Sequence, residues 1–349
     1  MRIISAGSAF PKQYYPQAVL SKAMEAYWEG QLENPQMIER LHQRTQVDGR
    51  HLALPLHEYY ELSTWGQANQ AWMRTAEELG EKALCRALAR AGADKASIGS
   101  LLFMSITGVS SPSIDAKLIN RMGLSPHVKR VPVFGLGCVG GAAGLARAAD
   151  YVKAYPKQLA ALVSVELCSL TIQRDDLSVA NLISCALFGD GAAAVLVAGV
   201  ECSGDGPEIL GAKSTFYPGT EDAMGWDISE KGFRIVLSPR VPEVVREHLG
   251  EDVDTFLAEH GLERGDIDSW IMHTGGPKVL EATQEALGVG RERLEASWEC
   301  LRRVGNLSSA SVLLVLEDFM TKRRPKPGSY SVLGAMGPGF CSELLLLRW

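Results

Sequence analysis

Three short segments each place one polar residue at a junction that leads into a predicted helix. Cys138 lies among five glycines in "VFGLGCVGGAAGLARAADYVKAY", directly after the apolar run "KRVPVF". His273 follows "SWIM" and opens "HTGGPKVLEA", and Asn306 follows a glycine in "RRVGNLSSASVLLVLE". A thiol needs a base or cationic neighbour to act as a nucleophile, and an acyl transfer needs donors for the developing oxyanion. Together these three residues make a suitable set for acyl transfer.

The helix predicted after Cys138 would act on its thiol. Backbone N–H groups in the first turn of a helix have no intrahelical partner, and the helix dipole adds partial positive charge there. A thiolate in that place is stabilised, so we expect the pKa of Cys138 to be lowered. The alternative is that Cys138 packs as a small hydrophobic residue, as free cysteines usually do.

The positions of His273 and Asn306 each allow a structural and a functional interpretation. His273 is expected at the carboxyl end of a strand, where ligands of open α/β sheets gather. Asn306 is either a helix N-cap or a rigidly held amide donor for an oxyanion. The other histidines lie in polar or helical contexts that indicate a solvated surface role. They are His42, His51, His57, His127, His248 and His260.

Composition narrows the class of protein. The chain has 349 residues, 46% of them hydrophobic, with a net charge of −6 and a mean hydropathy near zero. The charge gives no general attraction to nucleic acid or to anionic membranes, so small-molecule work is favoured. Seven cysteines without CxxC spacing indicate a reduced, cytoplasmic chain. No apolar stretch reaches the ~18 residues needed for a span, so we expect neither a targeting segment nor a membrane span.

The order of apolar runs and amphipathic segments predicts an α/β protein with a parallel sheet. A glycine-rich, acidic break at "GVECSGDGPE" interrupts the alternation, which then restarts. We therefore expect two α/β halves, residues 1–205 with the cysteine and residues 206–349 with the histidine and asparagine. The segment 30–75 is interpreted as a helical insertion.

The same three residues also fit a different class of enzyme. Papain-like proteases carry Cys, His and Asn in this order, with the histidine about 130–150 residues after the cysteine, and here the gap is 135. Their cysteine, however, lies in C-G-[SA]-C-[WY] near the mature N-terminus of a secreted chain. Cys138 is followed by "VGGAAG" and lies well inside the chain, which argues against a protease.

Five motifs in order make the chain resemble the type III polyketide synthases, the chalcone-synthase-like branch of the thiolase-fold condensing enzymes. They are "GCVGGAAG", "ALFGDGAAA", "HTGGPKVLE", "GNLSSASVLLVLE" and "MGPG". The resemblance implies a thiolase-like α/β fold, in which two similar βαβ-type halves form a layered αβαβα core. It also implies acyl-CoA and malonyl-CoA as substrates, a homodimer, and no cofactor, because loss of CO2 supplies the carbanion.

The resemblance also implies roles for individual residues. Cys138 matches the nucleophile that carries the starter and the growing chain, while His273 and Asn306 match the pair that binds malonyl thioester, promotes decarboxylation and stabilises the enolate. Phe188 and Phe233 match two aromatic gatekeepers between the CoA tunnel and the reaction cavity. The other residues matched to substrate binding are Arg40 and Arg44, for the CoA phosphates, and Thr171, Met224 and Ser308. The alternatives are core packing for Phe188 and helix-surface arginines for Arg40 and Arg44.

Several positions depart from the plant pattern of this family. They are Met37, Ser111, Cys168, Met224, Ala335 and Met336. All but Met37, which replaces a lysine of the CoA site, bear on the shape of the cavity, so they put the product rather than the reaction class in doubt. We expect an alkylpyrone or alkylresorcinol type of product. Two alternatives remain: a 3-oxoacyl-acyl carrier protein synthase III that stops after one condensation, and a non-catalytic protein that binds acyl-CoA or a partner enzyme. The sequence also leaves open whether the starter arrives on CoA or on an acyl carrier protein.

Overall fold

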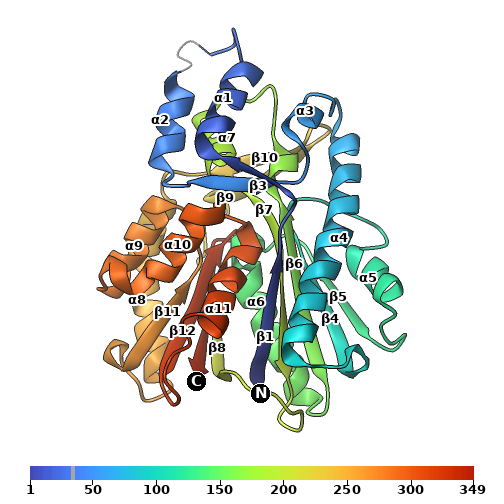
Figure 1. The fold of residues 1–349 in the computed structure, drawn as a ribbon. Coiled ribbons are helices and arrows are strands. Elements are labelled where there is room, and N and C mark those ends of the chain that lie inside the picture. The colour runs from blue at the N-terminus through green and yellow to red at the C-terminus, as the bar shows by residue number, and fades with distance from the viewer. Residues whose placement is uncertain (33–35) are drawn as a thin grey trace.

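The computed structural model describes residues 1–32 and 36–349, and nine strands form one sheet at its centre (Figure 1). Their order across the sheet is β11-β12-β13-β8-β1-β7-β6-β4-β5. In chain order they are β1 (Arg2–Ala9), β4 (Ile98–Met104), β5 (Lys129–Val133), β6 (Leu159–Leu167), β7 (Asp190–Ala198), β8 (Glu208–Phe216), β11 (Ile267–Met272), β12 (Tyr330–Gly337) and β13 (Cys341–Arg348). The predicted α/β class is confirmed.

The sheet is mixed, so the expectation of a parallel sheet is wrong. Strand β4 is parallel to β5 and β6, and β11 is parallel to β12, but the other neighbouring pairs are antiparallel. Only three residues, 338–340, connect β12 to β13, and a connection this short joins antiparallel neighbours. The hydrophobic runs gave no sign of this, because a strand buried on both faces looks the same in either direction.

Two helices lie inside the molecule and others cover the outer faces of the sheet (Figure 1). The inner pair is α6 (Gly140–Ala154) and α11 (Ser311–Thr321). The outer helices are α4 (Trp65–Ala91) and α5 (Ile114–Met122) on one side, and α8 (Val241–Ala258), α9 (Pro277–Leu287) and α10 (Glu295–Val304) on the other. The single sheet bends around the inner pair, so its two ends form two sheet layers and the order of layers is helix, sheet, helix, sheet and helix.

Alternating residues of the strands explain the layers. On β6, Leu162 packs with the inner helices, whereas Val163 packs with α4. On β13, Leu345 faces the inner helices, whereas Leu346 faces α8 and α9. Successive side chains of a strand point to opposite faces, so every central strand is covered by helices on both sides.

Smaller elements gather at the end of the molecule opposite the two termini (Figure 1). They are β2 (Gln13–Pro16), α1 (Gln17–Tyr27), α2 (Gln36–Arg44), β3 (Gly49–Leu52), α3 (Leu56–Tyr59), α7 (Val179–Leu187), β9 (Met224–Ser229) and β10 (Gly232–Leu237). We expected residues 30–75 to form a helical insertion. This is wrong for residues 65–75, because they are the start of α4 and contribute to a main core cluster. Residues 33–35 lie outside the described part of the chain.

The two halves of the chain meet between β7 and β8, where residues 199–207 contain no helix or strand. The boundary expected between residues 205 and 206 falls in this segment.

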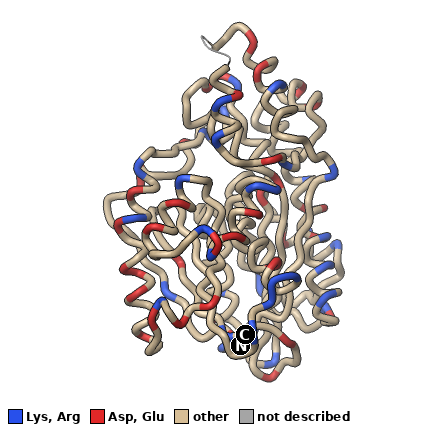
Figure 2. The backbone as a smooth tube through the Cα atoms, turned by 60° about the vertical axis from the view of Figure 1, so that its left-hand side comes forward, with Lys and Arg blue, Asp and Glu red and all other residues tan. Residues whose placement is uncertain are grey.

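In the view of Figure 2, basic and acidic residues are interspersed along the chain. Within residues 1–32 and 36–349, no helix has the length and hydropathy needed to cross a bilayer.

Candidate active site

Cys138 lies in a single 3-10 turn, residues 137–139, just before the buried helix α6. Gly137 enters this turn with φ +52°, and a Cβ atom there would lie 2.8 Å from Cδ of Pro338. The Cys138 side chain is buried, and its Sγ lies 3.8 Å from Oγ of Ser308. Gly137 therefore allows this turn to pack closely against the segment that follows β12.

The pKa of Cys138 is shifted opposite to the direction expected from the sequence. Burial raises the pKa of the Cys138 thiol to about 12, although hydrogen bonds from Ser308 and Asn306 lower it. Desolvation penalises the charged form of a buried group, and here it outweighs the effect of the helix terminus. The resting thiol is protonated at neutral pH, so a thiolate must be produced by proton transfer to a neighbouring base.

His273 directly follows β11, as the sequence predicted. Its backbone N–H donates to the carbonyl of Gly334 at 3.0 Å, and its ring is buried. Both ring nitrogens are without a hydrogen-bond partner among the described residues. Burial lowers the pKa of His273 to about 4, so the imidazole is neutral at neutral pH. One nitrogen of a neutral imidazole donates and the other accepts, which suits both proton transfer and binding of a carbonyl oxygen.

The side chain of Asn306 is oriented by its own segment. Its Oδ1 accepts hydrogen bonds from the backbone N–H of Ser308 at 2.7 Å and from Oγ of Ser311 at 3.3 Å. An amide oxygen that accepts from these donors leaves the NH2 group directed elsewhere. Asn306 and His273 line the same cavity together with Cys138, so the amide donor is available there.

The backbone of Asn306 is joined to the segment that carries Phe188. The N–H of Asn306 donates to the carbonyl of Leu187, and the N–H of Gly189 donates to the carbonyl of Asn306, both at 2.9 Å. These bonds form an isolated parallel bridge between Phe188 and Asn306. The amide donor and the Phe188 ring are therefore positioned as one unit.

We expect Gly305→Ala to disturb this unit. Gly305 has φ +76°, and a Cβ atom there would lie 2.5 Å from the carbonyl oxygen of Leu187. The unfavourable backbone conformation alone costs about 1–3 kcal/mol, so the free energy of unfolding in denaturant titration should fall by at least that much. The matched control is Gly92→Ala, since Gly92 also has positive φ but open space around its Cβ position. Equal losses in the two variants would contradict an effect of the close approach.

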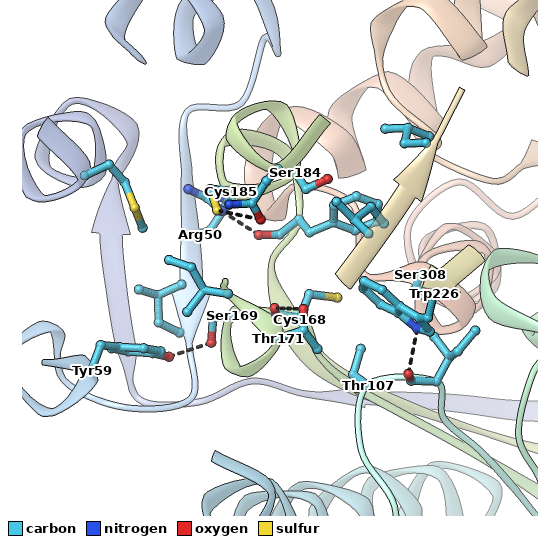
Figure 3. Close-up of a pocket in the computed structure, with 18 of the residues that line it drawn as sticks. Arg50, Tyr59, Thr107, Cys168, Ser169, Thr171, Ser184, Cys185, Trp226 and Ser308 are labelled. Atoms are coloured by element: carbon cyan, nitrogen blue, oxygen red, sulfur yellow. Dashed lines mark hydrogen bonds between the residues drawn. The ribbon is translucent and has the colours of Figure 1, made fainter. Parts of the chain in front are cut away.

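Two cavities meet at Cys138. The large cavity has a volume of about 1230 Å³, including the part open to solvent, and the small cavity has about 460 Å³ on the same measure. Figure 3 shows part of the wall of the large cavity. Of the residues expected to bind substrate, Phe188, Thr171, Met224 and Ser308 line the large cavity. Met224 lines the small cavity as well, so it stands with Cys138 between the two.

Phe233 is not in the wall of either cavity, which corrects the position expected for the second gatekeeper. Its ring is buried in an aromatic cluster with Trp65, Phe134 and Trp226, at centroid distances of 5.8–6.0 Å. It lines a third cavity, of about 910 Å³. Ile235, two residues further along β10, lines the large cavity instead. Residues two apart share a strand face, so from this face of β10 it is Ile235, and not Phe233, that reaches the large cavity.

Arg40 and Arg44 both lie on α2, as expected, and are exposed. Neither lines any of the three cavities, and neither has an ion pair within the described residues. They are free to bind phosphate at the surface, but the structure does not place them at the entrance of a cavity.

Sequence reasoning missed several residues of the large cavity. Trp226 lies in its wall, with the indole N–H donating to the carbonyl of Ile106 at 2.9 Å (Figure 3). One face of α1 also lines the cavity through Leu20, Ala23, Met24 and Tyr27. The period-2 pattern of "MGWDIS" and the period-3.6 pattern of α1 could have indicated a buried face, but not what that face borders.

The arrangement suits acyl transfer followed by carbon–carbon bond formation. A thiol, a neutral imidazole and an amide donor border one cavity, and the thiol also borders a second, larger cavity. An acyl group on Cys138 can occupy the large cavity while His273 and Asn306 act on a second thioester. Donors aimed at a developing enolate oxygen in a site without bulk water stabilise it strongly.

Comparisons with known proteins agree with this chemistry. The model for the N-terminal domain of chalcone and stilbene synthases matches residues 1–201, and the model for the C-terminal domain matches residues 208–349. A 1,3,6,8-tetrahydroxynaphthalene synthase from Streptomyces peucetius subsp. caesius is 54% identical over 90% of this chain and 84% of its own length. Another, from Streptomyces coelicolor, is 34% identical over 89% of this chain and 82% of its own length.

Solved structures show the same fold over the whole chain. The crystal structure of 1,3,6,8-tetrahydroxynaphthalene synthase from Streptomyces coelicolor, a bacterial type III polyketide synthase, has a TM-score of 0.95 at 30% identity and covers 100% of this chain and 99% of its own. The C-terminal type III polyketide synthase domain of Steely1 from Dictyostelium has a TM-score of 0.92 at 27% identity and covers 99% and 98%. The comparisons give no support to the single-condensation alternative.

Proposed function

Because the chain belongs to the chalcone and stilbene synthase family and is a type III polyketide synthase, a condensing acyltransferase, we propose that Cys138, His273 and Asn306 carry out its reaction. In the first step, Sγ of Cys138 attacks the carbonyl carbon of an acyl-CoA starter. His273 takes the thiol proton, and the proton passes to the CoA thiolate as its carbon–sulfur bond breaks. The products are acyl-Cys138 and free CoA.

In the second step, the malonyl thioester end of malonyl-CoA enters the small cavity. Its thioester oxygen accepts hydrogen bonds from the imidazole of His273 and the amide of Asn306, and the bond to the terminal carboxylate breaks with release of CO2. The electron pair forms an enolate, whose carbon attacks the carbonyl of acyl-Cys138. The thiolate of Cys138 leaves, and the chain, now two carbons longer, is attached to CoA. No proton is removed from carbon, so the proposal includes no metal or other cofactor.

The observation that carries this proposal is the position of Cys138 at the meeting point of both cavities, with His273 and Asn306 in only one of them. The test is mass spectrometry of products from the purified enzyme with heavy-isotope malonyl-CoA and acyl-CoA starters from acetyl to palmitoyl. Pyrones or resorcinols with two or three malonate-derived units are the expected result. A single-extension product would contradict it. Acyl-Cys138 without extension would point to an acyl carrier protein as donor.

A second candidate product follows from the 54% identity to a 1,3,6,8-tetrahydroxynaphthalene synthase. In this alternative, the enzyme makes a naphthalene from malonyl units only. The same assay with malonyl-CoA alone separates the candidates, because an acyl-starter enzyme then gives little aromatic product. A strong naphthalene signal without added starter would favour the second candidate.

We also propose a homodimer. Strand β5 forms an edge of the nine-stranded sheet, and four of its five residues are exposed. Val131 on this strand and Phe134 just after it are large exposed hydrophobic residues. An edge strand with unpaired backbone groups and exposed apolar side chains readily accepts another chain.

Light scattering should therefore give twice the 37.8 kDa mass of the chain. Phe134→Glu is expected to shift the protein toward the monomer, since it places a charge in the proposed interface. The control is Phe216→Glu, because Phe216 is also exposed but lies at the end of β8 on a different part of the sheet. A wild-type monomer, or an unchanged dimer with Phe134→Glu, would contradict the proposed interface.

A further inference from the structure

Arg50 of β3 is a buried cation in the wall of the large cavity (Figure 3). Its side chain is only 2% exposed, and burial lowers the pKa of its guanidinium group to about 10, so the group keeps its charge at neutral pH. Among the described residues that line this cavity, no other is Lys, Arg, Asp or Glu. A buried charge is unfavourable unless it is paired and hydrogen-bonded, so the partners of Arg50 decide what this part of the cavity can bind.

Two of the three nitrogens of the Arg50 guanidinium group have partners. Nη1 donates to the carbonyl of Phe188 at 2.5 Å, and Nε donates to Oε1 of Gln17 at 3.3 Å. Nη2 is screened from solvent and has no hydrogen-bond partner among the described residues. The guanidinium group is planar, so the two existing bonds fix its orientation. The N–H groups of Nη2 are therefore rigidly held donors that lack an acceptor.

The acid nearest in effect, Asp190, does not fill this place. Its charge favours the charged form of Arg50, but within the part of the chain that the structure describes Arg50 forms no ion pair. The Asp190 oxygens are held elsewhere: Oδ1 accepts from the N–H of Ser169 at 2.9 Å, and Oδ2 accepts from the N–H of Ala53 at 2.6 Å. An acceptor for Nη2 has to come from the occupant of the cavity.

Neighbouring polar side chains of the same wall use their donors on the backbone. Oγ1 of Thr171 donates to the carbonyl of Cys168 at 2.8 Å (Figure 3), and Oγ of Ser184 donates to the carbonyl of Ala180 at 2.8 Å. These hydroxyl groups are satisfied without a ligand, whereas Nη2 of Arg50 is not. Buried donors in proteins are nearly always paired, so this one marks a place for an oxygen atom of the ligand.

We propose that Nη2 of Arg50 binds an acceptor oxygen of the chain attached to Cys138, which makes Arg50 a specificity-determining residue for oxygen-bearing chains. Both residues border the large cavity. Each extension adds one keto oxygen to the chain, and a starter with a second carboxyl group carries such oxygens from the beginning. A hydrogen bond from a charged donor is stronger than one between neutral groups. A site built to bind a substrate oxygen also discriminates against an analogue without it, because the buried donor is then left unpaired.

The inference rests on the proposed loading of Cys138, and matched thioesters test it. One pair is 3,5-dioxohexanoyl-CoA and hexanoyl-CoA. The other is glutaryl-CoA and isoheptanoyl-CoA, which has the shape of the glutaryl group without its carboxylate. Intact-protein mass spectrometry gives the rate constant for loading each group on Cys138. In Arg50→Met, the ratio of the oxygenated to the hydrocarbon member should fall at least about tenfold, as expected for a lost hydrogen bond to a charged group. Loss of the contact with Phe188 alone would slow both members and leave their ratio unchanged.

Arg174→Met is the matched control. Nη2 of Arg174 also donates to backbone carbonyls, those of Tyr59 and Tyr60, but Arg174 lines the third cavity and not the large one. Its two ratios should equal those of the wild type. In Arg50→Met, a fall in the dioxohexanoyl ratio identifies keto oxygens as the acceptor, and a fall in the glutaryl ratio alone identifies the carboxylate of a starter. Unchanged ratios in both pairs overturn the inference and leave the loading step intact.

The wild-type enzyme provides a second test that does not depend on the folding of Arg50→Met. A crystal structure with a dioxohexanoyl or glutaryl group on Cys138 should place an oxygen within about 3.2 Å of Nη2 of Arg50. The absence of any acceptor oxygen near Nη2 in both acylated forms overturns the inference. A wild-type enzyme that loads none of the four groups on Cys138 contradicts the proposed function itself, and the inference with it.

Discussion

Replacing Cys138 by alanine is expected to lower polyketide formation by more than about 10³-fold, while malonyl-CoA is still converted to acetyl-CoA and CO2. Removal of a covalent nucleophile costs several orders of magnitude in rate, and without acyl-Cys138 the enolate has no electrophile. The enolate itself should still form, because Oδ1 of Asn306 keeps its hydrogen bonds from Ser308 and Ser311 when Cys138 is replaced. The stranded enolate then takes a proton from water and leaves as acetyl-CoA.

The measurement for Cys138→Ala follows polyketide by mass spectrometry and CO2 by release from carboxyl-labelled malonyl-CoA. Cys85→Ala is a suitable control, since Cys85 is exposed on α4 and lines none of the three cavities. It should match the wild type in both readouts. Parallel loss of decarboxylation in Cys138→Ala would show that the cysteine is needed to bind or activate malonyl-CoA, contrary to the proposed division of roles.

The residues that sequence motifs located best are those tied to a local backbone feature. Cys138, His273 and Asn306 each follow a strand or a glycine turn that the sequence shows directly. Positions at such junctions depend on a few neighbouring residues, so they could be recognised from short segments. The structure adds what the segments lacked: all three border one cavity.

Cavity walls were harder to predict because they depend on packing between distant elements. The wall of the large cavity comes from α1, β3, α3, α7 and β10, among others. Phe233 and Ile235 lie on one face of β10, but Phe233 packs against Trp65, Phe134 and Trp226, whereas Ile235 lines the cavity. Local spacing cannot distinguish the two positions.

The pKa of Cys138 also depends on distant elements, because burial by the rest of the chain sets its direction. The helix that follows the cysteine was evident from sequence, but the loss of solvent around the thiol was not. Desolvation raises the pKa of the thiol and lowers that of His273, so both groups rest in their neutral forms. A neutral His273 offers one donor nitrogen for the malonyl thioester and one acceptor nitrogen for the thiol proton. The two pKa shifts oppose the proton transfer itself, so in the proposed loading step the transfer has to be coupled to attack on the starter carbonyl.

Asn306→Ala is expected to lower the rate of malonyl-CoA decarboxylation by about 10²–10³-fold, the usual effect of removing one oxyanion donor. Loading of the starter on Cys138 should change much less, because the proposed loading step uses the thiol and His273. Carboxyl-labelled malonyl-CoA measures the first step, and intact-protein mass spectrometry of acyl-Cys138 measures the second. Equal losses in both steps would contradict a role confined to the enolate.

Asn306→Asp distinguishes a donor from a structural cap. A carboxylate oxygen can still accept from the backbone N–H of Ser308 and from Oγ of Ser311, so the segment should keep its conformation. The side chain, however, no longer offers an N–H to an enolate oxygen and adds a negative charge beside it. If Asn306 acts as a donor, Asp should be at least as slow as Ala in decarboxylation; if it only holds its segment in place, Asp should restore most of the rate that Ala loses.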